Sequence, residues 1–543
     1  MTLDLASLRR LTPVLLLVTG CSGDGPTDAA RPGGSSPNVL MIVVDDLNDW
    51  TGHLGGHAAT ETPHLDRLMD EGISFESAHA AAPVCIASRH AVLTGLAPTT
   101  SGIYGASIAT VRSFYQHGLE RENGGKVVPL PDLFDAAGYH TMAAGKIHHM
   151  GVSDLPRLAN WDESRPGAVW PEALARRGHG YQSPAGGHYY PFPEDGGAAY
   201  RAFGAVRGQA LAAGPMDADD IHPDGMPDTQ IADWAIERLG RTYEAPFLLA
   251  VGFIRPHLPY TAPREYFDAQ PFESLTVPEV PQDELTDVPQ LGRAMTVSML
   301  PEGDHQHVLD QGPDYWRELV HAYLACVRFV DAEIGRVLAA LDASEHGDDT
   351  IVVLWSDHGQ HLGEKLHWRK TCLWEESTRV PFVIRLPPDT ERLGDARPAA
   401  GARCSRTVSL LDLYPTLADL CGLGPLPWAD GVSLRPLLED PSALWDRPAV
   451  TTWLYGNHAV RSEHWRYIRY RDGTEELYDR RADPGEHENL AGDAWLGGVI
   501  DEHRRWLPAN ARPPFGTSAF EGGDYLDDLV AKLRVLEASG ETD

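Results

Sequence analysis

The stretch Asn38–Asp46 reads NVLMIVVDD, and it decides what kind of fold the chain adopts. From Asn38 to Val44 the run is apolar and rich in β-branched side chains, which is typical of a strand buried on both faces. Such strands occur in parallel sheets that helices cover on both sides. Asp45 and Asp46 follow at the carboxyl end of this strand, where open α/β sheets gather their ligands.

A second predicted strand ends in the same way. The apolar run 350–355 is followed by Ser356, Asp357, His358 and Gly359. Carboxylates at one edge of a sheet repel each other unless a cation neutralises them, and oxygen ligands suit Ca²⁺ or Mg²⁺. After a single strand, a turn or a helix cap is the simpler explanation of acidic residues. Two such ends in one chain favour a metal site.

The rest of the chain alternates between strand and helix patterns. This alternation predicts an α/β fold with a large, mostly parallel sheet sandwiched by helices. After residue 445, short strands separated by turn residues predict a smaller C-terminal antiparallel sheet. The predicted helices are 63–69, 85–93, 131–137, 228–239 with Asp228 as N-cap, 315–341 and 527–536; further strands are 73–77, 246–253, 450–454, 458–460, 465–470 and 476–478.

The charge balance excludes one class of partner. The chain has 45 Lys and Arg against 78 Asp and Glu, which gives a formal net charge of −33. Nucleic-acid binding requires a basic surface, so we expect no nucleic-acid partner. An anionic substrate must then be captured by a locally basic pocket against the mean field of the protein.

The N-terminus is typical of an exported protein. Arg9 and Arg10 precede the apolar run 11–18, which is too short to span a bilayer and fits a signal peptide. The run ends in VTGC at 18–21, which resembles a bacterial lipobox, a signal in which Cys21 is lipidated. A plain signal peptide with an incidental cysteine is the alternative. We therefore expect a periplasmic protein or an outer-membrane or cell-surface lipoprotein, attached to the membrane only through its N-terminal lipid.

Cys85 is the candidate nucleophile. It lies at the predicted start of a helix, and Arg89 follows one turn later. The helix N-terminus and the guanidinium would both favour an anion at this position. A buried cysteine and a surface arginine would also fit the same residues. The sequence also leaves open whether the other cysteines pair.

The segments around these residues resemble the type I sulfatase family of the alkaline phosphatase superfamily. Cys85-x-x-x-Arg89, followed by Leu93-Thr94-Gly95, is similar to the sulfatase signature, in which the cysteine is oxidised to formylglycine. The resemblance covers roughly residues 38–491 and implies an alkaline-phosphatase-like fold. The other matching motifs are NVLMIVVDD at 38–46, GKIHHMG at 145–151, RPHLP at 255–259, SDHG at 356–359, LGE at 362–364 with Lys370, LYD at 477–479, and DPGE at 483–486 with Asn489 and Leu490.

Two spacings make the chain similar to the iduronate-2-sulfatase-like group of that family. His149 stands three residues after Lys146, and His358 directly follows Asp357, as in that group. His148 lies between the first two residues and is a neighbour that could substitute for His149.

The resemblance implies a metal site and a modified nucleophile. One Ca²⁺ per chain would be bound by Asp45, Asp46, Asp357 and His358, and the formylglycine made from Cys85 would complete the shell. Histidine is an uncommon Ca²⁺ ligand, so His358 could instead orient the substrate. The hydrated formylglycine would attack sulfur, retain the sulfate covalently, and then expel it as the aldehyde re-forms.

The resemblance also implies catalytic roles for Cys85, Arg89, Lys146, His149, His257 and Lys370. Lys146, His257 and Lys370 would hold sulfate oxygens, and His257 would protonate the leaving oxygen. His149 would support the modified Cys85, and Arg89 would help to lower the pKa of its hydroxyl. As structural alternatives, Lys146 and His149 could be a surface pair, His257 could pack in its loop, and Lys370 could be a solvated base.

The expected function is removal of sulfate from a sulfated carbohydrate, with the saccharide and a formylglycine-generating maturase as partners. A phosphonate or phosphate diester hydrolase of the same superfamily and a catalytically inactive, glycan-binding surface lipoprotein are the alternatives. Residues 456–458 and Arg461 could contact a sugar ring. The predicted organisation is a signal peptide with lipobox at 1–21, a flexible tether at 22–37, a catalytic α/β domain at 38–444 and a small antiparallel-sheet subdomain at 445–543.

Overall fold

The computed structural model describes residues 36–105, 108–120, 125–149, 161–165, 180–182, 188–191, 203–204, 209–211, 213–218, 221–296, 304–388, 400–515 and 524–539. The predicted signal peptide lies outside these ranges, as does the predicted tether apart from its last two residues. None of the helices in the described ranges combines the length and the apolarity that a membrane crossing requires.

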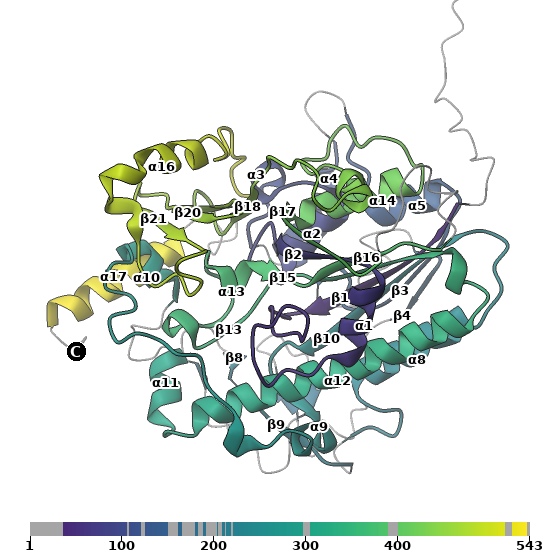
Figure 1. Ribbon diagram of the computed structural model, residues 1–543, viewed down its shortest axis with the longest axis horizontal. Coiled ribbons are helices and arrows are strands. Elements are labelled where there is room, and N and C mark those ends of the chain that lie inside the picture. The colour runs from purple at the N-terminus through teal and green to yellow at the C-terminus, as the bar shows by residue number, and fades with distance from the viewer. Residues whose placement is uncertain are drawn as a thin grey trace, which may run out of the picture.

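One large sheet forms the centre of the molecule (Figure 1). Its strands are β1 (Asn38–Asp45), β2 (Ile73–His79), β3 (His140–Gly145), β4 (Glu163–Arg165), β10 (Phe247–Pro256), β12 (Thr350–Ser356), β15 (Arg379–Val380), β16 (Phe382–Arg385) and β17 (Ala402–Ser409). They lie in the order β15-β2-β16-β12-β1-β10-β3-β4, and β17 pairs with β2 beside that path. The strands β12, β1, β10, β3 and β4 are parallel, whereas β16 is antiparallel to both of its neighbours.

Helices cover both faces of this sheet because the side chains of β1 alternate between two cores. Leu40 and Ile42 belong to the core built with α1, α8 and α12, whereas Val39 and Met41 belong to the core built with α2, α5 and α14. These helices are α1 (Pro63–Glu71), α8 (Pro227–Leu239), α12 (Tyr315–Ala343), α2 (Cys85–Thr94), α5 (Leu130–Ala136) and α14 (Leu413–Leu420). The predicted α/β sandwich is confirmed.

Neighbouring parallel strands end at one edge of the sheet, and this edge receives the predicted site residues. Val44 of β1 pairs with Ser356 of β12, so the acidic residues that follow them emerge side by side. Gly252 of β10 pairs with Gly145 of β3. Gly145 has φ +75°, and a Cβ on it would lie 2.0 Å from the Gly252 carbonyl oxygen, so only glycine allows β3 to end here and present Lys146.

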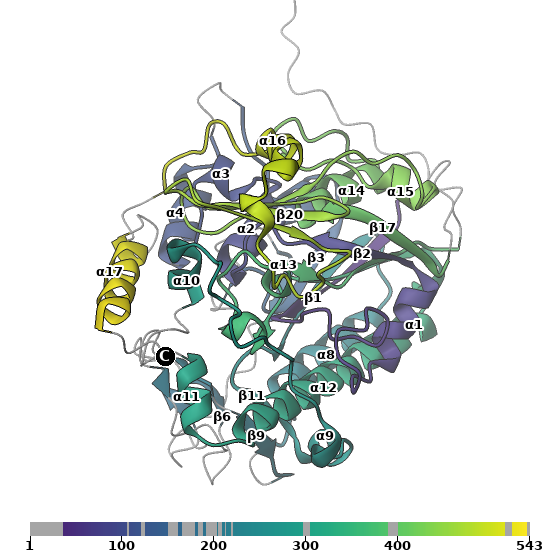
Figure 2. The ribbon, with the colours of Figure 1, turned by 60° about the vertical axis from the view of Figure 1, so that its left-hand side comes forward.

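The C-terminal part forms the small antiparallel sheet that the sequence predicts. Its strands follow one another in the order β18 (Ala449–Thr452), β19 (His458–Arg461), β20 (Trp465–Arg469) and β21 (Glu475–Asp479). Helix α16 (Gly497–Arg504), which the sequence did not predict, packs Ile500 on this sheet. Helix α17 (Asp524–Ser539) lies beside α10 (Gln290–Thr296) (Figure 2). The domain boundary at residue 444 stays a prediction.

The cysteines of the described chain carry free thiols, and shorter elements connect the layers. In the described ranges Cys85, Cys326, Cys372, Cys404 and Cys421 are buried and form no disulfide. The shorter elements are α3 (Pro98–Ser101), α4 (Ile108–His117), α9 (Arg264–Asp268), α11 (Asp304–Asp310), α13 (Glu375–Thr378), α15 (Arg435–Glu439), and the strand pairs β9 (Ala213–Met216) with β11 (Tyr260–Pro263), β13 (His361–Leu362) with β14 (Trp368–Arg369), β5 (Gly180–Gln182) with β6 (His188–Pro191), and β7 (Phe203–Gly204) with β8 (Gln209–Ala210).

Arg466 of β20 joins the small sheet to the segment around α13. Its guanidinium is fully buried and donates to Glu486 (2.6 Å), to the Leu373 carbonyl (2.8 Å) and to Thr378 (3.0 Å), and it also contacts Glu375. Buried ions of this kind depend on their partners, because an unpaired charge in the interior is strongly destabilising.

Replacing Arg466 by Met should lower the free energy of unfolding by about 3 kcal/mol, because Glu375 and Glu486 lose one of the two arginines that pair with both of them, and Arg480 remains at 3.3 and 3.5 Å. Breaking a buried ion pair costs about 3–5 kcal/mol. We expect the lower end of this range because Arg461 still lies 3.0 Å from Glu375. Arg505→Met is the matched control: Arg505 is exposed, and its loss should change stability by less than about 0.5 kcal/mol. Thermal unfolding followed by tryptophan fluorescence measures both, and equal effects would contradict the expectation.

Candidate active site

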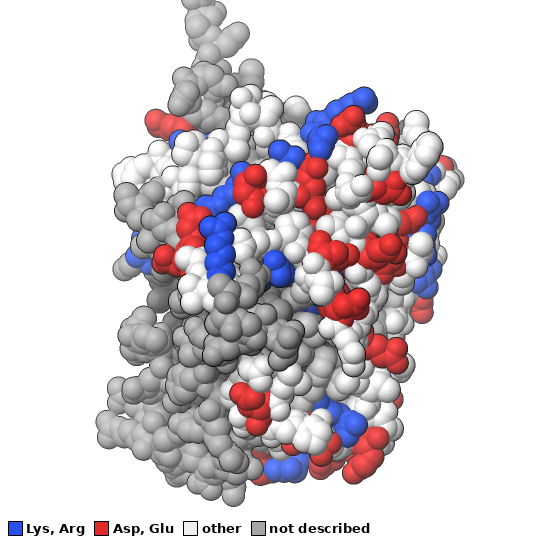
Figure 3. Space-filling model, turned by 90° about the vertical axis from the view of Figure 1, so that its left-hand side faces the viewer, with Lys and Arg blue, Asp and Glu red and all other residues white. Residues whose placement is uncertain are grey.

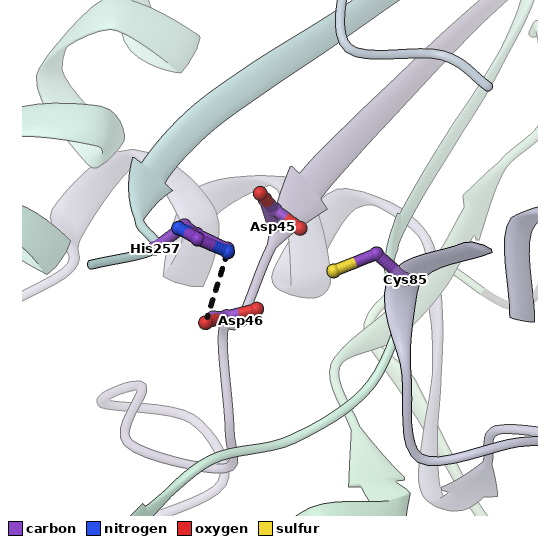
Figure 4. Close-up of side chains that lie close together, drawn as sticks. All are labelled: Asp45, Asp46, Cys85 and His257. Carbon is purple, nitrogen blue, oxygen red and sulfur yellow. Dashed lines mark ion pairs between the residues drawn. The ribbon is translucent and has the colours of Figure 1, made fainter. Parts of the chain in front are cut away.

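The tip of β1 is held in a strained conformation. Asp46 has φ +63°, a left-handed conformation that costs a non-glycine residue about 1–3 kcal/mol. Its N–H donates to the Asp357 carboxylate (3.2 Å), and its carbonyl accepts the Tyr323 hydroxyl of α12 (2.8 Å). These bonds fix the turn that places the carboxylates of Asp45 and Asp46 between His257 and Cys85 (Figure 4).

Cys85 is the first residue of α2, and its side chain is directed at this edge of the sheet. The residue is 3% exposed. Its sulfur lies 3.2 Å from His358 Nε2 and 3.3 Å from Lys370 Nζ, and it is hydrogen-bonded to His149. The thiol therefore lies at the meeting point of three predicted site residues that come from distant parts of the chain.

The acidic side chains fit a cation. Among the described residues, two groups have ligand atoms within 4.8 Å of one another: Asp45, Asp46, Cys85 and His257, and Asp45, Cys85, Asp357 and His358. The two groups share Asp45 and Cys85 and together contain three carboxylates, which match the preference of Ca²⁺ or Mg²⁺ for oxygen ligands, whereas the imidazoles match it less well. The donor chemistry thus supports a hard cation held by Asp45, Asp46 and Asp357.

Arg89 is not a surface residue, so that alternative is wrong. Its side chain is fully buried, with Nε 2.7 Å from Asp357 Oδ2 and Nη2 3.4 Å from Asp45 Oδ1. Lys146 contacts Asp45, and Lys370 Nζ lies 2.5 Å from Asp46 Oδ1. Lys146 and Lys370 are accordingly not free surface bases either.

The electrostatic surroundings favour an anion at Cys85. Burial opposes ionisation of this thiol, but the ammonium groups of Lys146 and Lys370 outweigh it and hold its pKa well below the usual value. Burial also opposes protonation of His358, but the Asp357 carboxylate and Cys85 outweigh it and raise its pKa to about 9. A negatively charged group bound at Cys85 would therefore be surrounded by cations.

Of the two adjacent histidines, only His149 faces the site. His149 is hydrogen-bonded to Cys85. His148 is buried elsewhere, edge-on to Tyr115 at 5.8 Å between ring centroids, and its Nε2 has no hydrogen-bond partner among the described residues. This arrangement speaks against His148 as a substitute for His149.

His257 reaches the site on the loop that follows β10. Its Nδ1 donates to the Leu258 carbonyl (2.6 Å), which leaves Nε2 facing Asp46 Oδ2 at 4.0 Å (Figure 4). The fully buried Arg255 donates to the carbonyl of His257 (2.9 Å). The Asp228 carboxylate accepts the N–H of Arg255 (3.1 Å). Buried side chains therefore fix this loop, and His257 Nε2 faces the carboxylates of the site, although its chemical role stays a prediction.

The predicted role of Asp228 as a helix cap is wrong. Helix α8 begins at Pro227 with Met226 as N-cap, so Asp228 lies inside its first turn. Its carboxylate accepts backbone N–H groups of Ile254 (2.7 Å) and Arg255 at the end of β10. Asp228 therefore ties α8 to the strand that carries the His257 loop.

The loop that presents Lys370 is the most strained part of the described chain. Lys365, Leu366, Arg369 and Thr371 all have positive φ, between 50° and 79°. Such conformations persist only where surrounding contacts over-determine them. In this loop, contacts on both sides of Lys370 do so.

Two ion pairs hold this loop from residues that lie far away in the sequence. The buried ammonium of Lys365 lies 2.8 Å from Glu284 and donates to the Glu486 carbonyl (2.5 Å). Arg369 lies 2.7 Å from Asp304 at the start of α11. The position of Lys370 beside Cys85 therefore depends on a mid-chain segment and on the C-terminal part.

All ten predicted site residues meet at this edge, although their chemical roles stay predictions. The sequence missed the supporting residues Tyr323, Glu284 and Asp304, for which no local pattern exists. It offered a signal for Ser356, which stands in the quoted SDHG motif: its hydroxyl accepts the Leu47 N–H (3.0 Å) and donates to the His358 carbonyl (3.0 Å).

Two family models and several known proteins match this chain, and those described below are all sulfatases or a sulphohydrolase. Residues 37–423 match the family described as Sulfatase, and residues 363–509 match the family described as N-sulphoglucosamine sulphohydrolase, C-terminal. A Formosa agariphila protein named Sulfatase is 35% identical over 87% of this chain and 86% of its own length. Iduronate 2-sulfatase of Mus musculus is 30% identical over 76% of this chain and 72% of its own. The solved structure of a 2-O GAG sulfatase has a TM-score of 0.62 at 21% identity, covering 93% of this chain and 94% of that one, and it shows a shared fold.

Replacing Glu284 by Gln should weaken binding of inorganic sulfate to the full chain about tenfold or more. Glutamine has the same shape as glutamate but no negative charge, so the Lys365 ammonium loses the carboxylate of Glu284. The strained loop should then relax, and Lys370 should move away from its position beside Cys85. Calorimetric titration in calcium-containing buffer measures the affinity. Glu279→Gln, at an exposed position of the same segment, is the matched control and should bind sulfate like the wild type. An unchanged affinity in Glu284→Gln would contradict the positioning role, whereas partial recovery in Glu284→Asp would support it.

Proposed function

Because the chain belongs to the sulfatase family, we propose that it removes sulfate from a sulfated carbohydrate with a formylglycine made from Cys85 as its nucleophile. The family assignment confirms the predicted enzyme class: the protein is a sulfuric ester hydrolase of the alkaline phosphatase superfamily. The formylglycine, the calcium ion and the nature of the carbohydrate belong to the proposal.

The environment of Cys85 carries this proposal. The side chain starts helix α2, contacts Lys370 and His358, and stands beside the carboxylates of Asp45 and Asp357. A buried thiol needs none of these neighbours for packing. A sulfate ester at the same place would need cations for its oxygens, a nucleophile for its sulfur and a proton donor for its leaving oxygen.

The residues of the chain divide these tasks. Lys146 and Lys370 each contact one carboxylate, and each ammonium has further N–H groups that would donate to sulfate oxygens. Arg89 fixes the carboxylates of Asp45 and Asp357 in place. When Cys85 is converted, the hydrated aldehyde would supply the oxygen that attacks sulfur.

Two histidines complete the proposed arrangement. His149 would hold the side chain at position 85, which it already contacts. His257 would protonate the leaving alcohol oxygen from Nε2, because Nδ1 is occupied by the Leu258 carbonyl. A Ca²⁺ bound by Asp45, Asp46 and Asp357, with His358 beside it, would supply the positive charge that polarises the sulfate.

We place the substrate among sulfated saccharides of the kind that iduronate-2-sulfatase-like enzymes act on. The iduronate 2-sulfatase relative and the spacing from Lys146 to His149 support this choice. We further propose that the protein is exported, as its N-terminal segment indicates, and that a membrane lipid on Cys21 is its only anchor. Conversion of Cys85 then requires a formylglycine-generating maturase in the host.

Cys85→Ala should lower kcat on an aryl sulfate at least about a thousandfold, because the nucleophile is lost. Cys404→Ala is the matched control, since Cys404 is a buried thiol on β17 far along the sheet order from β1, and its kcat should stay unchanged. Peptide mass spectrometry of the wild type should find an aldehyde in place of the Cys85 thiol. If the protein from the native host keeps an unmodified Cys85 and is inactive, the alternative of a glycan-binding lipoprotein is favoured. If kcat/KM is higher on an aryl phosphodiester than on an aryl sulfate, the alternative of a phosphate diester hydrolase is favoured.

Removing the metal with EGTA should abolish hydrolysis and lower the unfolding temperature, and added Ca²⁺ should restore both. The stability effect follows because a cation that binds only the folded state stabilises it by mass action. The control is Asp46→Asn, in which Ca²⁺ should raise the unfolding temperature less than in the wild type. Full activity after exhaustive chelation, with no metal detected by mass spectrometry, would refute the metal assignment.

A further inference from the structure

A large pocket lies outside the catalytic centre, between the small sheet, α10 and α17. Its volume is about 950 Å³, which is sufficient for a saccharide of more than one ring. It is bordered by the turn after β20, by the segment 508–511 and by the loop between β18 and β19. Its lining includes Tyr455, His458, Arg469, Arg471 and Arg534.

The pocket gathers guanidinium groups in a chain that is strongly acidic overall. Figure 3 shows Lys and Arg side chains among acidic ones on the face that carries α16 and α17. Arg534 donates to the neutral amide of Gln290 (3.0 Å). Arg471 pairs with Asp527, whose side chain is 70% exposed. A solvent-exposed ion pair of this kind contributes little to stability, so an anionic ligand would compete with Asp527 for Arg471 at little cost.

The positive charge of Arg469, the third guanidinium, is only partly neutralised. Arg469 lies 2.8 Å from Glu475, but Arg504 lies 2.7 Å from the same carboxylate, so one acid serves two bases. Asp472, the other acidic residue of the pocket wall, accepts hydrogen bonds from Thr474. The wall therefore offers several donors to anionic groups and keeps its own acids engaged.

An aromatic ring and uncharged polar groups complete the wall. Tyr455 is 40% exposed and stands edge-on to Tyr104 at 5.7 Å, which supports the ring while leaving a face for a sugar. Burial lowers the pKa of His458 to about 4, so this histidine is neutral at physiological pH. Of the residues expected to contact a sugar ring, Gly456 and His458 line the pocket, whereas Asn457 is fully buried outside its lining and Arg461 is buried against Glu375.

The same packed cluster supports the pocket and the catalytic helix. Leu291 and Tyr470 line the pocket and belong to a hydrophobic cluster that Val84 joins from the other side. Val84 is the N-cap of α2 and directly precedes Cys85. One hydrophobic cluster therefore contacts both the pocket wall and the residue that precedes the nucleophile.

We propose that this pocket is a second binding site that holds a distal, sulfated part of the saccharide chain, with Arg471 and Arg534 on its anionic groups and Tyr455 against a ring. This inference rests on the proposed function for its ligand class. The three guanidinium groups give the locally basic capture site that an acidic protein requires for a polyanion.

Calorimetry on the full chain carrying Cys85→Ala tests the site, with dextran sulfate oligosaccharide as the probe and uncharged dextran of equal length beside it. The Arg471→Ala/Arg534→Ala double variant should bind the sulfated probe at least tenfold more weakly. Arg505→Ala, an exposed arginine outside the pocket wall, should bind it like the parent. The parent should bind uncharged dextran much more weakly, and higher salt should weaken binding of the sulfated probe.

Equal affinity of the parent and the double variant would overturn the proposal, as would the absence of binding to the sulfated probe. Unfolding temperatures of all variants are measured in parallel, and a double variant that unfolds early is replaced by Arg534→Gln alone, for which at least a threefold loss is expected. Aryl sulfate hydrolysis by the mature wild type is measured separately. If the protein binds the probe but does not hydrolyse the aryl sulfate, the proposed function is refuted and the second binding site is supported. If it hydrolyses the aryl sulfate but does not bind the probe, the second binding site is refuted and the proposed function is supported.

Discussion

Burying several carboxylates side by side is the constraint on which the rest of the site depends. Asp45, Asp46 and Asp357 meet where the chain excludes water, and charge of one sign in such a place is strongly unfavourable unless it is compensated. The protein compensates it with Arg89 from a helix, Lys146 from the end of a neighbouring strand and Lys370 from a distant loop. The two lysines would also donate to sulfate oxygens, so the charges that stabilise the buried carboxylates also favour an anionic substrate.

The parallel sheet explains why so many residues arrive at one point. Neighbouring parallel strands end at the same edge, so each supplies the residue that follows its last paired position. The edge alone is not sufficient, however, because the turn at Asp46 and the loop around Lys370 adopt conformations that isolated peptides avoid. Tyr323 stabilises the first and the Lys365–Glu284 pair the second. The chemistry is thus carried at strained positions that distant parts of the chain hold in place.

Much of the fold and the site could be predicted from the sequence because their signals are local. The apolar runs of β1 and β12 identify strands buried on both faces, and the motifs around Cys85 and Asp357 carry the family resemblance. The burial of Arg89 could not be predicted from physics alone, since nothing local shows that two strand tips converge on it. Glu284 was missed and Asp228 was misassigned for the same reason, because their partners lie far along the chain. In the sequence, an acidic residue that caps a helix cannot be distinguished from one in a surface turn or one that holds a distant loop.

The small C-terminal sheet contacts both the loop that presents Lys370 and the second pocket. Through Arg466 and Glu486 it is tied to the loop that presents Lys370, and its β18–β19 loop and the turn after β20 form a wall of the second pocket. The inner contacts are buried ion pairs, which tolerate little change because breaking one leaves an unpaired charge. The outer contacts are exposed pairs such as Arg471–Asp527, whose loss changes stability little. The same sheet can therefore keep the catalytic geometry constant while its outer surface varies, so that saccharide selectivity changes without disturbing the sulfate site.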